Sequence, residues 1–249
     1  MSEKRVALVT GGVGGIGTAI CEALTGHGLT VVAGYHPAEE ERANEWLETH
    51  RAKGLDVHTA VGDVASFDSA QTMISDIEAR VGPISVLVNC AGITRDKFFH
   101  KMDADQWNAV ISVNLNSVFN VTRHVLPGMR DRGFGRIVNI SSVNGQKGQA
   151  GQANYSAAKA GMHGVTMALA QETALKGITV NTVAPGYVAT AMTEAIDEKI
   201  RNAIIETIPM RRMGRPEEIA KAVAFLCSDD AAYITGAVLP VNGGLFTAH

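Results

Sequence analysis

The alternation of short apolar runs with longer helical patterns constrains the fold of this chain more than any other feature. Runs such as VALV, VVA, VLVN and IVNI are apolar at consecutive positions, which is typical of strands covered by helices on both faces. These runs predict strands at Arg5–Thr10, Thr30–Gly34, Asp56–Ala60, Ser85–Asn89, Arg136–Ser141, Thr179–Ala184 and Ala237–Pro240. Repeated β–α alternation implies right-handed crossovers, so we expect an α/β fold with a doubly wound parallel sheet of about seven strands.

Helical patterns fill the segments between the predicted strands. They predict helices at Gly15–His27, Ala38–Lys53, Ser66–Val81, Ala104–Arg132, Tyr155–Lys176 and Pro216–Ser228. The 249 residues hold no Pro/Ser-rich linker and no internal repeat, so we expect a single domain over residues 1–249. Segment 186–214 differs, because it follows a Pro-Gly turn, has helical pieces over Met192–Ile208 and follows a strand end, where such sheets bind ligands. We interpret it as a substrate lid; an ordinary pair of surface helices is the alternative.

Composition and charge exclude several classes of function. The formal net charge is −3 and no long Lys/Arg tract occurs, so the chain has no general attraction to nucleic acid or acidic membranes. No apolar stretch reaches the roughly 18 residues of a membrane span. Cys21, Cys90 and Cys227 lie far apart, which is typical of reduced thiols in a cytosolic protein, and the histidines lack metal-ligand spacing. We therefore expect a soluble, cytoplasmic protein without a metal.

A glycine-rich run, residues 10–17 (TGGVGGIG), directly follows the first predicted strand and opens the first helix. Glycines there allow a tight turn and close approach of the backbone to a pyrophosphate, and the helix N-terminus offers free N–H groups to its negative charge. The strand–turn–helix context favours a Rossmann-type dinucleotide site. A tight turn without a ligand is the alternative.

Tyr155 and Lys159 stand four residues apart, so on a helix they share one face. A neighbouring cation favours the phenolate, so we expect Lys159 to lower the pKa of Tyr155 from its usual value of about 10. Tyr155 is then a candidate general acid that protonates a carbonyl oxygen as hydride arrives at the carbon. Taken alone, such a pair is common, and an exposed helix face is then the favoured interpretation.

The spacing of Thr10, Gly11, Gly15 and Gly17 resembles that of the short-chain dehydrogenase/reductase family, and residues 89–92 (NCAG) resemble its Asn-Asn-Ala-Gly turn, with Cys90 as a departure. The resemblance spans essentially the whole chain. It implies a catalytic set in which Ser142, thirteen residues before Tyr155, donates to the substrate carbonyl, with Ser141 as the alternative. It further implies that Asn114 holds a water beside Lys159, and that Lys159 also holds the nicotinamide ribose.

The same resemblance implies a cofactor site along the strand ends, with Asp63 at the adenine and residues 185–190 beside the nicotinamide. The predicted cofactor residues are Thr10, Gly11, Gly12, Gly15, Ile16, Gly17, Gly34, Tyr35, His36, Arg42, Asp63, Val64, Asn89, Ala91, Gly92, Tyr155, Lys159, Pro185, Gly186, Val188 and Thr190.

The end of the second strand bears on the choice between NADPH and NADH. Its residues 34–36 (GYH) lack the carboxylate with which NAD enzymes bind the ribose 2′-hydroxyl. Arg42 and His36 are candidates for a 2′-phosphate, although residues 39–41 (EEE) oppose it. We expect NADPH, with NADH as the alternative.

Within the family the chain is most similar to the reductases of β-ketoacyl thioesters. One branch reduces 3-oxoacyl groups on acyl carrier protein, and the other reduces acetoacetyl-CoA to (R)-3-hydroxybutyryl-CoA for polyhydroxybutyrate synthesis. Residues 142–149 (SVNGQKGQ) and 166–172 (TMALAQE) resemble the second branch, and Gly133 lacks the basic residue usual in the first. The acyl-CoA thioester is therefore the expected substrate. A dinucleotide-sensing regulator without turnover is a distant alternative.

The resemblance and the loop positions nominate a few residues around the substrate. Gln149, Gln152 and Tyr187 are placed to line its pocket with Ser142, and Asp96 to gate the entrance; a solvated loop residue is the alternative reading for each.

Family members commonly form tetramers through the helices containing Asn114 and Tyr155. The helix after Tyr155 carries a face of small residues that suits close packing across a two-fold axis. This face comprises Ala157, Ala160, Gly161, Gly164 and Ala168. We expect a homotetramer, with Met162, His163 and Met167 in the core or at subunit contacts.

Overall fold

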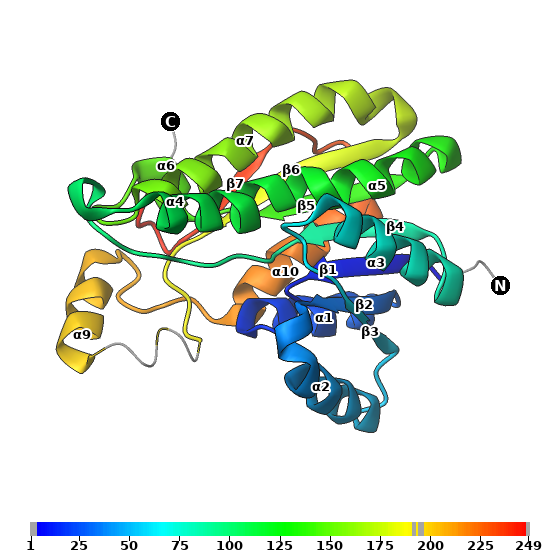
Figure 1. Cartoon of the computed structure of the whole chain (residues 1–249), viewed down its shortest axis with the longest axis horizontal. Coiled ribbons are helices and arrows are strands. Elements are labelled where there is room, and N and C mark those ends of the chain that lie inside the picture. The colour runs from blue at the N-terminus through cyan, green and yellow to red at the C-terminus, as the bar shows by residue number, and fades with distance from the viewer. Residues whose placement is uncertain (1–3, 191–192, 194–196, 248–249) are drawn as a thin grey trace.

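A computed structural model of the chain describes residues 4–190, 193 and 197–247. Seven strands form one parallel sheet in the order β3-β2-β1-β4-β5-β6-β7 (Figure 1). The strands are β1 (Val6–Thr10), β2 (Thr30–Tyr35), β3 (Val57–Val61), β4 (Ile84–Asn89), β5 (Gly135–Ile140), β6 (Ile178–Pro185) and β7 (Val238–Val241). The chain order reverses direction between β1 and β4, which confirms the predicted doubly wound, Rossmann-type sheet.

Helices cover both faces of this sheet. They are α1 (Gly15–Gly26), α2 (Glu40–Ala52), α3 (Phe67–Arg80), α4 (Ala104–Ile111), α5 (Ser117–Arg132), α6 (Val143–Lys147), α7 (Ala153–Thr173), α9 (Glu198–Thr207) and α10 (Pro216–Cys227). Figure 1 shows α4, α5 and α7 in the upper part of the molecule, with α9 apart from the sheet at the left. The predicted helix ranges overlap these elements except in two regions described below and at α6, which none of the predicted ranges covers.

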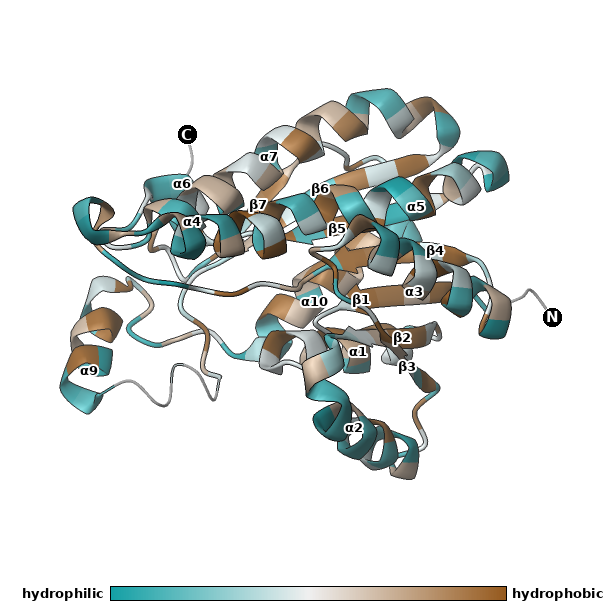
Figure 2. Cartoon of the chain, viewed as in Figure 1, coloured by the Kyte–Doolittle hydropathy of each residue, from teal (hydrophilic) through white to brown (hydrophobic). Residues whose placement is uncertain are grey.

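Side chains that alternate along each strand build two separate cores. In β1, Val9 belongs to the core under α1, α2 and α10, whereas Leu8 belongs to the core under α3, α5 and α7. Because successive side chains of a strand point to opposite faces, both faces of β1 are buried, as the run VALV predicts. Figure 2 shows the result: β1 and β2 are hydrophobic along most of their length, while the outer helix α2 is largely hydrophilic.

The predicted helix Ala104–Arg132 is interrupted. A π-helical turn over Ser112–Asn116 separates α4 from α5 and buries Asn114 completely. A π-turn inserts one extra residue, which rotates a side chain to a face that regular helical spacing would not give it. The apolar periodicity on either side carries no sign of this insertion.

The predicted lid also differs in its details. Its described helix is α9, from Glu198 to Thr207, and Met192, where the predicted helical region begins, lies outside the described residues. The two ends of segment 186–214 meet, because Gly214 N donates to Tyr187 O at 2.9 Å and Ala189 N donates to Gly214 O at 2.8 Å.

Candidate active site

The glycine-rich turn between β1 and α1 has no room for a side chain at Gly12 or Gly17. A Cβ on Gly12 would lie 2.7 Å from Ala33 Cα, and a Cβ on Gly17 would overlap the carbonyl oxygen of Gly11. The backbone of Gly11 has a φ of +63°, a conformation that favours glycine. Helix α1 begins at Gly15 after the N-cap residue Gly14, with no side-chain cap and no acidic residue in its first turn. Its first N–H groups are therefore left for an anion.

The turn after β4 is fixed to this glycine turn by Thr10. Its Oγ1 accepts hydrogen bonds from the backbone N–H groups of Cys90 (3.0 Å) and Ala91 (3.1 Å). Asn89 points elsewhere: its Nδ2 donates to Asn139 Oδ1 at 2.8 Å and to Thr122 Oγ1 at 3.2 Å. The side chain of Asn89 thus links the end of β4 to β5 and α5 inside the protein, and its cofactor role stays a prediction.

The residues predicted to select the cofactor lie at the start of α2. Arg42 Nη2 donates to Val13 O in the glycine turn at 2.6 Å, while its Nη1 pairs with Glu39 Oε1 at 3.2 Å. His36 is exposed, and its Nδ1 accepts from Ala38 N at 3.2 Å. The structure therefore brings Arg42 to the edge of the glycine turn, with one acidic neighbour already paired to it.

Two further predicted cofactor residues follow β3. Asp63 Oδ1 accepts from Ala65 N at 2.9 Å, and Val64 O accepts from Asn120 Nδ2 at 2.9 Å. These bonds hold the turn after β3 at the carboxyl end of the sheet, where β1 and β4 also end.

The two serines after β5 point in different directions. Ser142 Oγ caps α6 by accepting from Asn144 N at 3.1 Å, and the Ser142 hydroxyl lies near enough to Tyr155 to act to lower the pKa of its phenol. Ser141 Oγ donates to Lys159 O at 2.8 Å and lies 2.9 Å from His163 Nε2. Because the Ser141 hydroxyl is engaged with α7, Ser142 is the serine that faces Tyr155.

The pKa of Tyr155 moves in the direction opposite to the prediction. Burial of the phenol raises its pKa above the usual value of 10.0, and the nearby Ser142 hydroxyl only partly opposes this shift. Lys159 Nζ lies 5.6 Å from the centre of the Tyr155 ring and does not offset the burial. The predicted lowering is therefore wrong, because the spacing of two residues on a helix does not reveal how deeply the phenol is buried.

Lys159 is a buried cation with few partners. Its side chain is 3% exposed, and Nζ donates to Ile140 O at 2.8 Å. Desolvation lowers its pKa from 10.5 to about 8, although Cys90 nearby acts to raise it. An ammonium held this way is ready to give up its proton near neutral pH.

Asn114 meets Lys159 across Gly92. A Cβ on Gly92 would lie 3.4 Å from Lys159 Nζ and 3.5 Å from Asn114 Oδ1. Both amide atoms of Asn114 are bonded to the backbone of Ile93, Oδ1 accepting at 2.8 Å and Nδ2 donating at 2.9 Å. The π-turn thus delivers Asn114 to the turn after β4, beside the lysine.

Of the predicted substrate residues, Gln152 and Asp96 are joined and Gln149 stands apart. Gln152 Nε2 donates to Asp96 Oδ2 at 2.8 Å, and its Oε1 accepts from Asn144 Nδ2 at 2.9 Å. Gln149 Oε1 instead accepts from Lys147 Nζ at 3.0 Å. Asn144 was not predicted; its backbone bond to Ser142 and its side-chain bond to Gln152 connect the serine with this loop.

The residues after β6 reach the glycine turn. A Cβ on Gly15 would lie 3.1 Å from Thr190 Cγ2, and Gly186 packs against Asn242. Pro185 and Val188 are buried, and the phenol of Tyr187 is half-buried, which raises its pKa. The base of segment 186–214 therefore lies against the first turn of α1.

Known proteins resemble this chain over nearly its whole length. A family described as Enoyl-(Acyl carrier protein) reductase matches residues 12–246. An acetoacetyl-CoA reductase from Allochromatium vinosum is 64% identical over 97% of this chain and 98% of the relative. Nodulation protein G from Azospirillum brasilense is 58% identical over 98% and 99%, and a 3-oxoacyl-[acyl-carrier-protein] reductase from Haemophilus influenzae is 44% identical over 98% and 99%.

The chain belongs to the short-chain dehydrogenase/reductase family.

Members of this family are oxidoreductases that use a nicotinamide dinucleotide, and the residues present here fit such a group. Gly12 and Gly17 keep the glycine turn tight, because a Cβ on either would clash with the protein's own atoms, and the uncapped N-terminus of α1 leaves N–H groups for a pyrophosphate. The carboxyl ends of β1, β4 and β5 bring the turn, Gly92 and Lys159 to one edge of the sheet.

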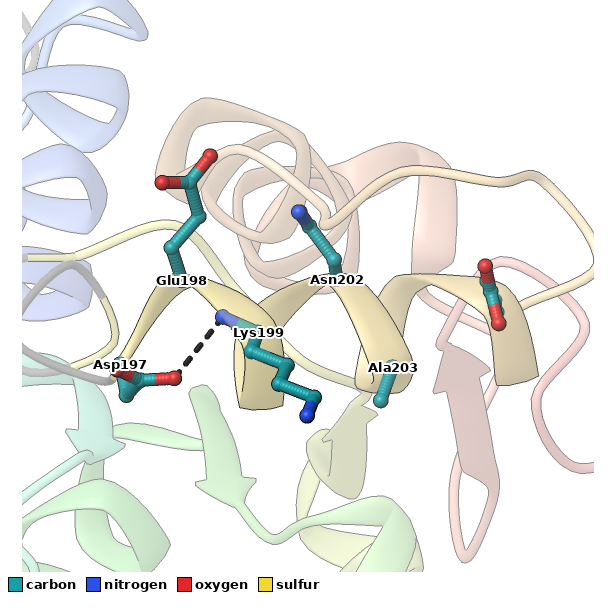
Figure 3. A pocket seen from close by; sticks show the side chains of 6 residues that line it. Asp197, Glu198, Lys199, Asn202 and Ala203 are labelled. Atoms are coloured by element: carbon teal, nitrogen blue, oxygen red, sulfur yellow. Dashed lines mark hydrogen bonds between the residues drawn. The ribbon is translucent and has the colours of Figure 1, made fainter.

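One hollow of the described residues lies away from these predicted catalytic residues. A shallow hollow beside α9 is lined by Asp197, Glu198, Lys199, Asn202, Ala203 and Glu206 (Figure 3). None of the predicted catalytic residues lines this hollow, and Asp197 caps α9 by accepting from Lys199 N at 3.0 Å. Within the described residues there is no helix long and apolar enough to cross a membrane, and no His/Cys/Asp/Glu cluster suited to a metal.

Proposed function

We propose that this chain reduces acetoacetyl-CoA to (R)-3-hydroxybutyryl-CoA with NADPH and so feeds polyhydroxybutyrate synthesis. The observation that carries the proposal is the convergence of Ser142, Tyr155 and Lys159 at the carboxyl end of β5, next to a dinucleotide cradle. Relatives named acetoacetyl-CoA reductase, from 54% to 64% identical over at least 97% of the chain, support this substrate.

The proton in this reaction comes from Tyr155. The bound nicotinamide supplies the hydride. Burial raises the pKa of the Tyr155 phenol, so the phenol stays protonated at neutral pH and can donate to the carbonyl oxygen of the substrate. Ser142, whose hydroxyl lies near the same phenol, donates to that oxygen as well and stabilises the charge that develops on it.

Lys159 and Asn114 resupply the proton and hold the cofactor in this scheme. The Lys159 ammonium binds the ribose hydroxyls and, with its pKa near neutrality, passes a proton toward Tyr155. Asn114 positions a water beside it across Gly92, using the carbonyl oxygen that also accepts from Ile93. A carbonyl oxygen has two lone pairs, so this second bond is available.

The substrate is held by the loop before α7 and by segment 186–214 acting as a lid. Asn144 and Asp96 fix both ends of the Gln152 amide, so Gln152 presents one orientation to the acyl group. Gln149 and Tyr187 complete the pocket, and Asp96 gates its entrance.

NADPH is the proposed cofactor because Arg42 lies against the glycine turn while the end of β2 lacks a carboxylate. The ion pair between Arg42 and Glu39 offsets the charge of one of the three glutamates, residues 39–41, that would repel a 2′-phosphate. NADH is the alternative.

We further propose a cytoplasmic homotetramer, built on the outer faces of α5 and α7. Ala157, Ala160, Gly164 and Ala168 are exposed on α7, and Phe119 on α5 is 59% exposed. Small and aromatic side chains left on a helix surface suit close packing against another copy. Gly161 serves the fold instead, because a Cβ there would lie 2.9 Å from Leu115 Cδ2 of the same chain.

A second candidate is reduction of 3-oxoacyl groups on acyl carrier protein, favoured by the relative of that name at 44% identity. Initial rates with NADPH and NADH, each against acetoacetyl-CoA and a 3-oxoacyl carrier protein, separate the possibilities. We expect the highest kcat/KM for NADPH with acetoacetyl-CoA. A preference for the carrier protein would replace the substrate, and tight cofactor binding without turnover of any ketone would indicate a regulator.

A further inference from the structure

Helices α1 and α2 are joined by polar contacts that the proposed chemistry does not use. Trp46 Nε1 on α2 donates to Thr18 Oγ1 on α1 at 3.0 Å. One turn further along both helices, Glu22 Oε1 lies 3.2 Å from His50 Nε2 and accepts from Lys53 Nζ at 3.1 Å. These contacts fix the register of α2 along α1.

Trp46 is the centre of this contact. Its side chain is 7% exposed, and its ring stacks on His50 with centroids 4.1 Å apart. The Thr18 hydroxyl that accepts from Trp46 also reaches Gly12 O at 3.4 Å, and Thr18 N donates to Gly14 O at 2.7 Å. The Trp46 contact therefore ends on the glycine turn that cradles the dinucleotide.

Arg42 stands one turn before Trp46, so the two side chains share a face of α2. Its guanidinium bonds the same turn through Val13 O at 2.6 Å. Glu39, Glu40 and Glu41 directly precede Arg42 at the start of the helix, and Glu39 pairs with it. Since charge interactions fall with distance, a small displacement of α2 changes the balance between attraction by Arg42 and repulsion by the glutamates for a 2′-phosphate.

We propose that Trp46 and Thr18 are positioning residues that hold Arg42 at the 2′-phosphate subsite and so help determine selectivity for NADPH over NADH. This inference rests on the proposed cofactor. We call the contact from the Trp46 indole N–H through the Thr18 hydroxyl to the glycine turn the strut. The strut acts on the phosphate only through the position of Arg42.

The test measures binding of NADP⁺ and NAD⁺ by titration calorimetry, without turnover. Trp46→Phe keeps the ring and removes the donor, and Thr18→Val keeps the shape and removes the hydroxyl. For each we expect the Kd for NADP⁺ to rise about fivefold, the value of one hydrogen bond, while the Kd for NAD⁺ changes less than about twofold. Thr18→Ser, which keeps a hydroxyl, should bind NADP⁺ with most of the wild-type affinity, unlike Thr18→Val.

A double-variant cycle shows whether the effect runs through Arg42. In an Arg42→Ala background, Trp46→Phe should weaken NADP⁺ binding no further, because the group being positioned is gone. Trp107→Phe, at the other tryptophan of the chain, is the matched control and should leave both constants unchanged. Melting temperatures identify any variant that fails to fold, in which case Thr18→Val carries the test.

Equal weakening of NADP⁺ and NAD⁺, additive effects with Arg42→Ala, or no effect of either substitution would overturn the inference. Failure of the proposed cofactor has a different signature: wild-type protein would then bind NAD⁺ at least as tightly as NADP⁺. In that case the positioning role is still supported if Trp46→Phe weakens binding of NADP⁺ but not of NAD⁺, and does so only when Arg42 is present.

Discussion

Two buried cations contact opposite ends of strand β5 and are treated in opposite ways. At the amino end, Arg136 donates to the carbonyl oxygens of Gly135, Gly177 and Ser228 and pairs with Asp229. The guanidinium carbons of Arg136 and Arg5 lie 4.4 and 3.8 Å from the centre of the Phe134 ring. At the carboxyl end, Lys159 Nζ donates to Ile140 O, its one acceptor among the described residues.

The difference separates a structural cation from a chemical one. Burial lowers the pKa of both groups, but Asp229 acts against that shift at Arg136 and a guanidinium stays charged at any physiological pH. Lys159 has no carboxylate among the groups that shift its pKa, which falls to about 8. The protein therefore maintains an unfavourable charge at the end of the sheet where the proton is needed.

Replacing Lys159 should have the largest effect, because turnover and stability should change in opposite directions. Lys159→Met should reduce turnover on the order of a thousandfold, because it removes the proton path. It should also stabilise the fold: a lysine pKa lowered from 10.5 to about 8 corresponds to roughly 3 kcal/mol of burial cost, less about 1 kcal/mol for the lost hydrogen bond. Urea unfolding at pH 7 measures this, with the exposed Lys221→Met as control. A destabilised Lys159→Met would show that the charge is well accommodated.

The serines at the same end of β5 provide the next test. Ser142→Ala should lower kcat by about a hundredfold, because one donor to the developing charge is lost. Ser141→Ala should leave kcat within about threefold and cost about 1 kcal/mol of stability, since its hydroxyl bonds Lys159 O inside the protein. Steady-state kinetics with acetoacetyl-CoA distinguishes the two. Equal losses of kcat would mean that both hydroxyls serve the reaction.

At the amino end of β5 the effect should be on stability alone. Arg136→Met leaves three carbonyl oxygens without their donor, while Asp229 remains solvated because it is 67% exposed. We expect a loss of about 2 kcal/mol in the free energy of unfolding, with kcat/KM at 25 °C unchanged. Chemical denaturation and rate assays on the same preparation give both values. A selective loss of activity would tie this end of the sheet to catalysis.

The pH dependence is the smallest of these effects. Lys159 is charged below its pKa of about 8 and neutral above it, so kcat/KM for NADPH should fall up to tenfold per pH unit above about 8. Because the folded pKa lies below the unfolded value of 10.5, the same group should raise the free energy of unfolding between those two pH values. Lys159→Arg should remove the midpoint near 8 from the rate profile. Its persistence there would assign that midpoint to another group.

Local pattern was enough to predict much of the fold and part of the site. The runs VALV and IVNI predict buried parallel strands because both faces of each are covered, and the glycines of residues 10–17 predict the turn before α1. The four-residue spacing of Tyr155 and Lys159 correctly predicts that they lie on one helix. All of these depend on neighbours close in sequence.

Sequence patterns did not predict the features that depend on contacts between distant segments or on burial. The π-turn that places Asn114 leaves no mark on the apolar periodicity, and the raised pKa of Tyr155 follows from its depth rather than its spacing. The bonds of Asn89 to Asn139 and of Ser141 to α7 join segments far apart in the chain. No pattern within one segment reports which way such a side chain turns.

The most direct measurement is the oxidation of NADPH with acetoacetyl-CoA by wild-type protein and Tyr155→Phe, with NADP⁺ binding measured in parallel. Phenylalanine keeps the ring and removes the hydroxyl that we assign as proton donor. We expect wild-type turnover, a loss on the order of a thousandfold in the variant, and a Kd for NADP⁺ within about twofold of wild type. Near-normal turnover by Tyr155→Phe would contradict the assignment of Tyr155 as the acid.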